Sequence, residues 1–265
     1  MLGKLLKQDA KALSRYLVPL HAAVVVLAVF GRLFITQSAD WSDPSPLLII
    51  YIIGFTLILV TMMTGTSLII AVYFYRNLFS KHGYLSWTIP ASAGQHLASK
   101  TIAGYIWLVL DYMIAMAAAA LFLAVPSIPW SEISDSYSEE MGFSLFTFLL
   151  ILSGIAVVSC FCGIMSYYVA IAAGQLFSNH RVLGAVIVYC VLTFLVQIFV
   201  SIALFIGPNG FGFVITDTLN ASDQNITWGV QYIQMMWRIG FASLIEGIIF
   251  YVITYYIMNK RLNLS

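Results

Sequence analysis

Charged residues are scarce in this chain: Asp, Glu, Lys and Arg make up 9% of its 265 residues. Soluble domains carry about 25%. Here the hydrophobic content is 61% and the mean hydropathy is +0.94. The composition therefore indicates an integral membrane protein rather than a soluble domain.

Cysteine and enzyme motifs are also scarce. The chain has three Cys, all within apolar runs, and Cys160 and Cys162 point to different sides of a helix because they are two residues apart. We interpret them as buried small residues rather than as metal or redox ligands. The sequence contains no G-x-x-x-x-G-K-[ST], H-E-x-x-H or G-x-S-x-G motif. We therefore predict no catalytic residue, no metal site and no enzyme activity in this chain.

Long apolar runs dominate what remains. A spanning helix needs about 20 mostly apolar residues. The runs of that length are residues 16–35, 46–73, 101–124, 143–173, 182–206 and 237–258. The short alternating segments of a membrane barrel do not occur. The predicted fold class is an all-α integral membrane protein with six transmembrane helices, forming one domain over residues 1–265.

The basic residues are distributed unevenly between the predicted loops. One side carries Lys4, Lys7, Lys11, Arg15, Arg76, Lys81, Lys100, Arg181, Lys260 and Arg261. The loops of the other side carry acids and no Lys or Arg. Because Lys and Arg are retained on the cytoplasmic side, both termini and residues 75–100 are predicted to be cytoplasmic. Residues 36–45, 125–142 and 207–236 are then outside.

Residues 1–15 form an amphipathic pattern. At 100° per residue, Leu5, Leu13 and Leu17 fall on one side and the basic residues fall on the other. This pattern predicts a cytoplasmic interfacial helix on the inner leaflet, or simply a topological anchor for the first span. Asp9 lies at the edge of the apolar side, where a carboxylate is costly without a partner.

Residues 75–100, between the second and third spans, mix polar, aromatic and turn-forming residues. Gly83 predicts a break, and Pro90 disfavours helix at Ile89. Ser92 and Gln95 have the spacing of a capping box that starts a helix leading into the third span. The pattern predicts a helix–break–helix hairpin. From the residues alone, an ordinary loop attached to the lipid surface explains it equally well.

The same stretch resembles bacterial ABC-transporter permeases of the ABCG-like, six-span exporter class. The residues that carry the resemblance are Tyr75–Phe79, Gly83–Leu85, Thr88–Pro90, Ser92, Gln95 and Ser99–Lys100. In that class this segment is the coupling element that docks onto the ATPase. The resemblance implies coupling roles for Tyr84, Leu85, Trp87, Ile89, Pro90, Ser92 and Gln95. The chain has no fused ATPase domain, so the resemblance implies a separate one.

The resemblance predicts the membrane subunit of an ATP-driven exporter in the bacterial cytoplasmic membrane. Two permease chains, identical or different, would pair above two cytoplasmic ABC ATPase subunits that bind ATP and Mg²⁺, so this chain needs no cofactor of its own. Nucleic acid is not expected as a partner. The substrate would be a hydrophobic or amphipathic peptide, lipid or drug. The alternatives are an ion-driven secondary transporter and a membrane subunit for peptide immunity or sensing that does not transport.

Two further features accompany this prediction. Asp111 and Glu246 lie within predicted spans, where a charge at the bilayer centre costs at least about 2.5 kcal/mol. They therefore either line the transport path or brace the helices.

Residues 207–236 are too long for a simple turn. They form either a re-entrant segment that dips into the outer leaflet, as in the class that the chain resembles, or a folded surface loop.

Overall fold

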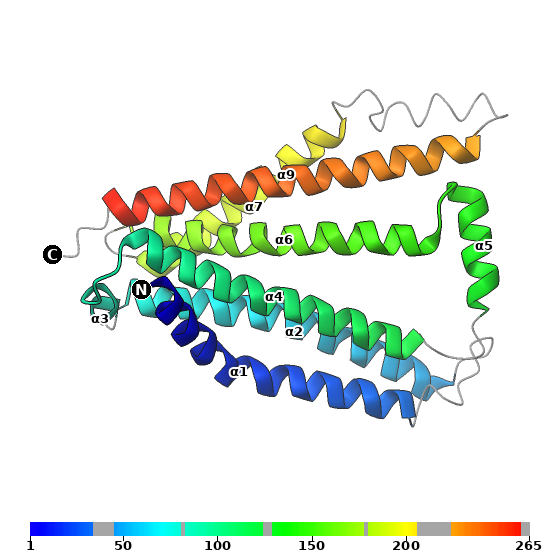
Figure 1. Cartoon of the computed structure of the whole chain (residues 1–265), viewed down its shortest axis with the longest axis horizontal. Coiled ribbons are helices and arrows are strands. Elements are labelled where there is room, and N and C mark those ends of the chain that lie inside the picture. Colours follow the sequence, from blue (N-terminus) through cyan, green and yellow to red (C-terminus); the bar gives the residue numbers. More distant parts are fainter. Residues whose placement is uncertain (34–44, 81–82, 124–128, 178–179, 206–223, 261–265) are drawn as a thin grey trace. The chain divides into compact units, whose positions relative to one another are not determined.

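The fold is built from helices. The computed structural model describes residues 1–33, 45–80, 83–123, 129–177, 180–205 and 224–260, and within these ranges it contains no strand (Figure 1). The helices are α1 (Leu2–Gly31), α2 (Pro46–Leu78), α3 (Gly83–Trp87), α4 (Ala93–Leu123), α5 (Trp130–Met141), α6 (Leu145–Gly174), α7 (Arg181–Phe205) and α9 (Gln224–Lys260). Of the predicted outer segment 207–236, residues 207–223 are not among the described residues. Residues 224–236 belong to α9.

Six of these helices, α1, α2, α4, α6, α7 and α9, are long and apolar enough to cross a membrane. The all-α, multi-pass prediction is confirmed at this level. The sides on which the termini lie stay a prediction. The first and last helices extend well beyond the predicted spans 16–35 and 237–258, because polar residues at their ends continue the helix.

The described residues divide into two compact units, one within residues 1–129 and the other within residues 130–260. The prediction of a single permease domain over residues 1–265 stays a prediction. Each unit contains three of the long helices.

In the first unit, α1 packs against both α2 and α4 (Figure 1). Its buried face recurs every three or four residues along the whole helix, as the helical period requires. That face consists of Leu5, Asp9, Leu13, Leu17, His21, Val24, Ala28 and Gly31. The amphipathic N-terminal segment and the predicted first span are therefore one continuous helix, whose apolar side is covered by the chain's own helices. Its position on the membrane surface stays a prediction.

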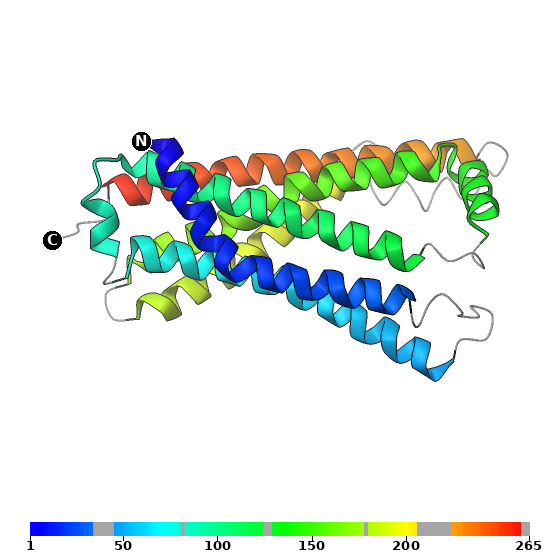
Figure 2. The same ribbon diagram turned by 60° about the horizontal axis from the view of Figure 1, so that its bottom comes forward.

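α1 also bends along its length (Figure 2). Pro19 lies inside the helix and has no N–H to donate to the preceding turn. Such a loss is an established cause of a helix bend. Beyond it, Ala28 of α1 packs with Phe55 of α2 and Ala118 of α4 in a small buried cluster.

In the second unit, α6 packs against α9 and α7. Phe148 of α6 lies beside Tyr232 of α9, and Cys162 lies beside Gly247 further along both helices, so α6 and α9 run parallel. Tyr167 of α6 stacks on Tyr189 of α7 with ring centroids 4.9 Å apart. The predicted outer loop 125–142 contains a helix, α5, which carries four acids and packs against α9 and α6.

Gly247 sets how closely α6 and α9 approach. A Cβ placed there would lie 2.7 Å from the Phe161 ring and 3.3 Å from the Cys162 Cα. Small residues of this kind let membrane helices come into close contact.

We expect Gly247→Leu to lower the free energy of unfolding by about 1–3 kcal/mol, because the larger side chain forces α6 and α9 apart. Thermal unfolding of the purified chain in detergent measures the effect. Gly154→Leu is the matched control, since a Cβ at Gly154 of α6 meets nothing within 4 Å. Equal unfolding temperatures for the two variants would contradict the close α6–α9 contact.

Candidate functional site

The connection between α2 and α4 is a folded hairpin. α2 ends at Leu78, and the short helix α3 follows from Gly83. A Cβ at Gly83 would lie 2.7 Å from the Leu78 carbonyl carbon, so glycine is needed where the chain folds back on the end of α2. The Trp87 indole N–H donates to the Leu78 carbonyl at 3.1 Å and so satisfies one of the open acceptors at the end of α2.

The predicted capping box is present. The Ser92 hydroxyl accepts from the Gln95 backbone N–H at 3.3 Å, and the Gln95 side-chain oxygen accepts from the Ser92 N–H at 3.2 Å. α4 begins at Ala93, directly after this cap. The helix–break–helix prediction for residues 75–100 is confirmed in outline. The first helix of the hairpin, α2, ends at Leu78. Lys81 lies outside the described residues.

The predicted coupling residues differ in what surrounds them. Pro90 and Ser92 are exposed, and Ile89 is half-buried. Trp87 is half-buried against the His96 ring, with centroids 5.5 Å apart. Its indole thus stabilises the hairpin itself, and only part of the ring is left for a partner. The side chains of Tyr84 and Leu85 lie outside the described residues.

A buried ion pair lies within the helices next to the hairpin. Asp9 of α1 and Lys100 of α4 are 4% and 5% exposed, and Lys100 Nζ lies 2.9 Å from Asp9 Oδ1. The Tyr73 hydroxyl of α2 donates to the same oxygen at 2.7 Å, and the Ser99 hydroxyl donates to Asp9 Oδ2 at 2.5 Å. The Lys100 ammonium also lies over the Tyr73 ring. One carboxylate therefore joins α1, α2 and α4 at the point where the hairpin begins.

The sequence reasoning did not find this cluster. Lys100 was predicted to lie on the cytoplasmic side, in the helix that leads into the third span, and its burial and pairing with Asp9 were not predicted. The available signal was Asp9 itself, an acid beside an apolar helix face, which requires a partner. The partner is 91 residues away in the sequence, so no local pattern points to it.

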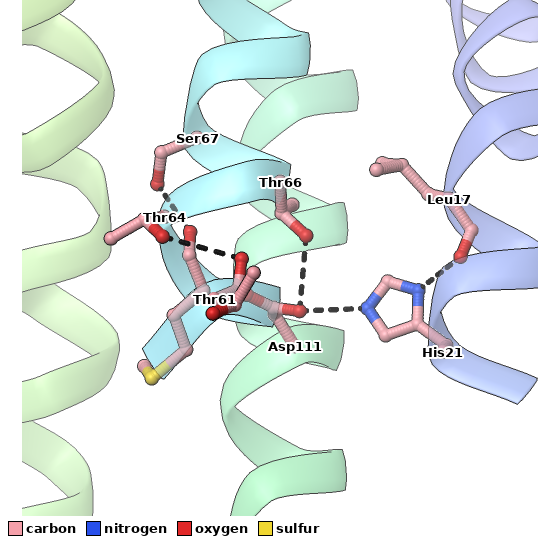
Figure 3. A network of polar contacts seen from close by, with 8 residues as sticks. Leu17, His21, Thr61, Thr64, Thr66, Ser67 and Asp111 are labelled. Atoms are coloured by element: carbon pink, nitrogen blue, oxygen red, sulfur yellow. Dashed lines mark hydrogen bonds and ion pairs between the residues drawn. The ribbon is translucent and has the colours of Figure 1, made fainter. Parts of the chain in front are cut away.

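A second buried polar cluster surrounds Asp111 of α4 (Figure 3). Its Oδ1 lies 2.8 Å from His21 Nε2 of α1 and accepts from the Thr66 hydroxyl of α2 at 3.1 Å. His21 Nδ1 lies 2.7 Å from the Leu17 carbonyl. The Trp107 ring stacks on the imidazole. Asp111 is 1% exposed, and its Oδ2 has no hydrogen-bond partner in the part of the chain that the structure describes.

The hydrogen bonds of His21 determine where its protons lie. A backbone carbonyl only accepts, so Nδ1 must carry a hydrogen. The bond between Nε2 and Asp111 Oδ1 then contains one further proton, which belongs either to the imidazole or to the carboxyl group. The pair is therefore an imidazolium with a carboxylate, or a neutral imidazole with a carboxylic acid. Both forms have zero net charge, which lowers the cost of burial.

Glu246 lies in the second unit, on α9. It is 8% exposed and within hydrogen-bonding reach of the Cys162 thiol of α6. Asp111 and Glu246 thus belong to different units and have separate partners. Within the described ranges, no three His, Cys, Asp or Glu side chains come together to hold a metal ion.

Comparisons with protein families, curated proteins and solved structures gave no match to this chain. The features of the candidate site all belong to the first unit. These are the hairpin with its cap, the Asp9–Lys100 pair below it, and the His21–Asp111 pair further along the same helices.

We expect Lys100→Met to lower the free energy of unfolding by about 3–5 kcal/mol, because it leaves the buried Asp9 carboxylate without its cation. Chemical denaturation in detergent measures this. Lys7→Met, at an exposed position of α1, should change stability by less than about 0.5 kcal/mol.

The double variant Asp9→Leu/Lys100→Met should recover part of the loss, since no charge is left buried. Recovery should be incomplete because Tyr73 and Ser99 lose their acceptor. A double variant as unstable as the sum of the single variants would show that the two side chains do not act as a pair.

Proposed function

We propose that this chain is the membrane subunit of an ATP-driven exporter of the ABC type, which receives its ATPase as a separate polypeptide. The observation that carries the proposal is the folded hairpin between α2 and α4. It has its own helix, a two-way cap and a hydrogen bond to the end of α2. The resemblance of residues 75–100 to the coupling element of such permeases adds to it.

The hairpin is connected by hydrogen bonds to the two long helices that flank it. The Ser92–Gln95 cap joins it to α4, and the Trp87–Leu78 bond joins it to α2. Seven residues after Ser92, Ser99 and then Lys100 bind Asp9 of α1. A force on the hairpin would therefore reach three helices of the first unit through short polar contacts.

The surface offered to a partner is small and mixed. Thr88 and Pro90 are exposed, and Ile89 is half-buried between them. The proposed coupling residues remain Tyr84, Leu85, Trp87, Ile89, Pro90, Ser92 and Gln95. In the proposed complex, two permease chains pair, the ATPases bind ATP and Mg²⁺, and a hydrophobic or amphipathic substrate leaves a bacterial cell.

The His21–Asp111 pair favours a second candidate, an ion-driven transporter. A buried carboxylate–imidazole pair inside candidate spans can hold and release a proton, and such groups mark proton pathways in membrane proteins. Among the described residues, the buried Asp111 Oδ2 has no hydrogen-bond partner. The same pair also braces α1 against α2 and α4, which an ATP-driven exporter needs equally.

We expect Ile89→Asp to weaken recruitment of the ATPase by at least about thirtyfold, because a buried interface side chain contributes about 2 kcal/mol or more. Copurification of the ATPase from native membranes, followed by its substrate-stimulated ATP hydrolysis, measures this. The variant should insert normally, since Ile89 lies in no candidate span.

Ile133→Asp is the matched control. Ile133 is an exposed apolar residue of α5, in a segment predicted to lie outside the cell. It should leave ATPase recruitment unchanged. If Ile89→Asp recruits the ATPase and transports as the wild type does, residues 75–100 are only a loop and the proposed function fails.

Asp111→Asn separates the two candidates, because the amide can still bind Thr66 and His21 but cannot share a proton. For the ATP-driven exporter we expect the variant to assemble and to retain ATP-dependent transport that a protonophore does not abolish. Transport in substrate-loaded vesicles measures both properties. Loss of transport in Asp111→Asn, together with loss in the wild type when the proton gradient is removed, would support the ion-driven alternative.

A further inference from the structure

A groove between α1 and α2 has two ends of different character. Its volume is about 520 Å³. On α2, Arg76 and Asn77 line one end, Leu68 and Ile69 line the other, and Val72 lies between them. Arg15 and Tyr16 of α1 line the facing side. Leu68 and Arg76 are eight residues apart on one helix, which is about 12 Å along its axis.

Among the described residues, neither arginine of the groove has an acidic partner. The ion pairs of the described residues are His21–Asp111 and Lys100–Asp9, and neither includes Arg15 or Arg76. Asp9 lies near this end of α1, but Lys100, Ser99 and Tyr73 already occupy its oxygens. The groove therefore presents two uncompensated guanidinium groups, which prefer phosphate and carboxylate oxygens.

The apolar end is open as well. Leu68, Val72 and Tyr16 are 57%, 52% and 58% exposed, on helices that are long and apolar enough to span a membrane. In a bilayer, these side chains face acyl chains. Arg76 lies one turn beyond Val72, towards the end of α2, where a headgroup would be located.

We propose that this groove binds an anionic phospholipid. Its phosphate lies between Arg15 and Arg76, with Asn77 as a further donor, and an acyl chain lies along Val72 and Leu68. Charge complementarity selects an anionic headgroup, and the apolar end distinguishes a lipid from a free anion. The proposal does not depend on the exporter function.

The site also has a consequence for the neighbouring ion pair. Tyr73 lines the groove while its hydroxyl binds Asp9. A lipid held against α1 and α2 therefore contacts the side chain that connects both helices to Lys100. Lipid binding would stabilise the α1–α2 contact at the start of the hairpin.

The test uses the purified full-length chain in nanodiscs of phosphatidylcholine that contain a minor fraction of photoactivatable phosphatidylglycerol. Peptide mass spectrometry locates the cross-links. We expect labelling of Tyr16 and Val72 that exceeds labelling by a photoactivatable phosphatidylcholine. Arg15→Gln/Arg76→Gln should reduce it about thirtyfold, from about fivefold for each arginine.

Lys7→Gln/Lys11→Gln is the matched control, since it removes the same charge from exposed positions of α1 outside the groove. It should change labelling less than twofold. Leu68→Trp fills the apolar end, keeps both arginines and should also reduce labelling. Circular dichroism and gel filtration establish that each variant is folded.

Four outcomes would overturn the proposal. They are equal labelling of the wild type and the double arginine variant, equal labelling by phosphatidylcholine, displacement of the lipid by inorganic phosphate alone, and a disulfide-linked dimer through Val72→Cys in a chain without its native cysteines. The third would identify a free-anion site, and the fourth would place a second copy of the chain in the groove.

Discussion

The cost of an unpaired charge in an apolar surrounding determines how the first unit is assembled. In a bilayer, apolar contact does not distinguish the inside of a helix bundle from its outside, because lipid is as apolar as leucine. Buried polar pairs do distinguish them. Asp9 must face Lys100, and His21 must face Asp111, so the two pairs determine which face of α1 meets α4. The spacings, twelve residues on α1 and eleven on α4, also set these helices parallel.

The second unit reaches a similar arrangement by different means. In each unit the first and third long helices run parallel and the second contacts both. In the first unit two polar clusters hold the parallel pair. In the second, close packing at Gly247 and the Glu246–Cys162 contact are found between α6 and α9. Dispersion contacts weaken steeply with distance, so the close packing at Gly247 fixes the separation between α6 and α9.

Local patterns predicted the parts of the fold that are locally determined. The six apolar helices follow from hydropathy, and the start of α4 follows from Ser92 and Gln95, which interact within one turn. The partner of Asp9 could not be predicted in this way. A lysine at this position near the start of a helix is compatible with both a solvated and a buried side chain, and the neighbouring residues do not distinguish the two. The interior role of Trp87 was missed for the same reason, since its acceptor is a backbone carbonyl that has no sequence signal.

The relative strengths of these contacts decide how the hairpin would behave under load. The cap at Ser92 contributes about 0.5–2 kcal/mol, and breaking a buried ion pair costs about 3–5 kcal/mol. A force that separates the hairpin from the bundle would therefore open the cap before it separates Lys100 from Asp9. A force directed along α4 leaves the cap unloaded, because helix and cap move together, and acts on the Lys100–Asp9 pair between α4 and α1 instead. In the proposed exporter the hairpin would transmit displacement along α4, and the buried carboxylate of Asp9 would carry it to α1 and, through Tyr73, to α2.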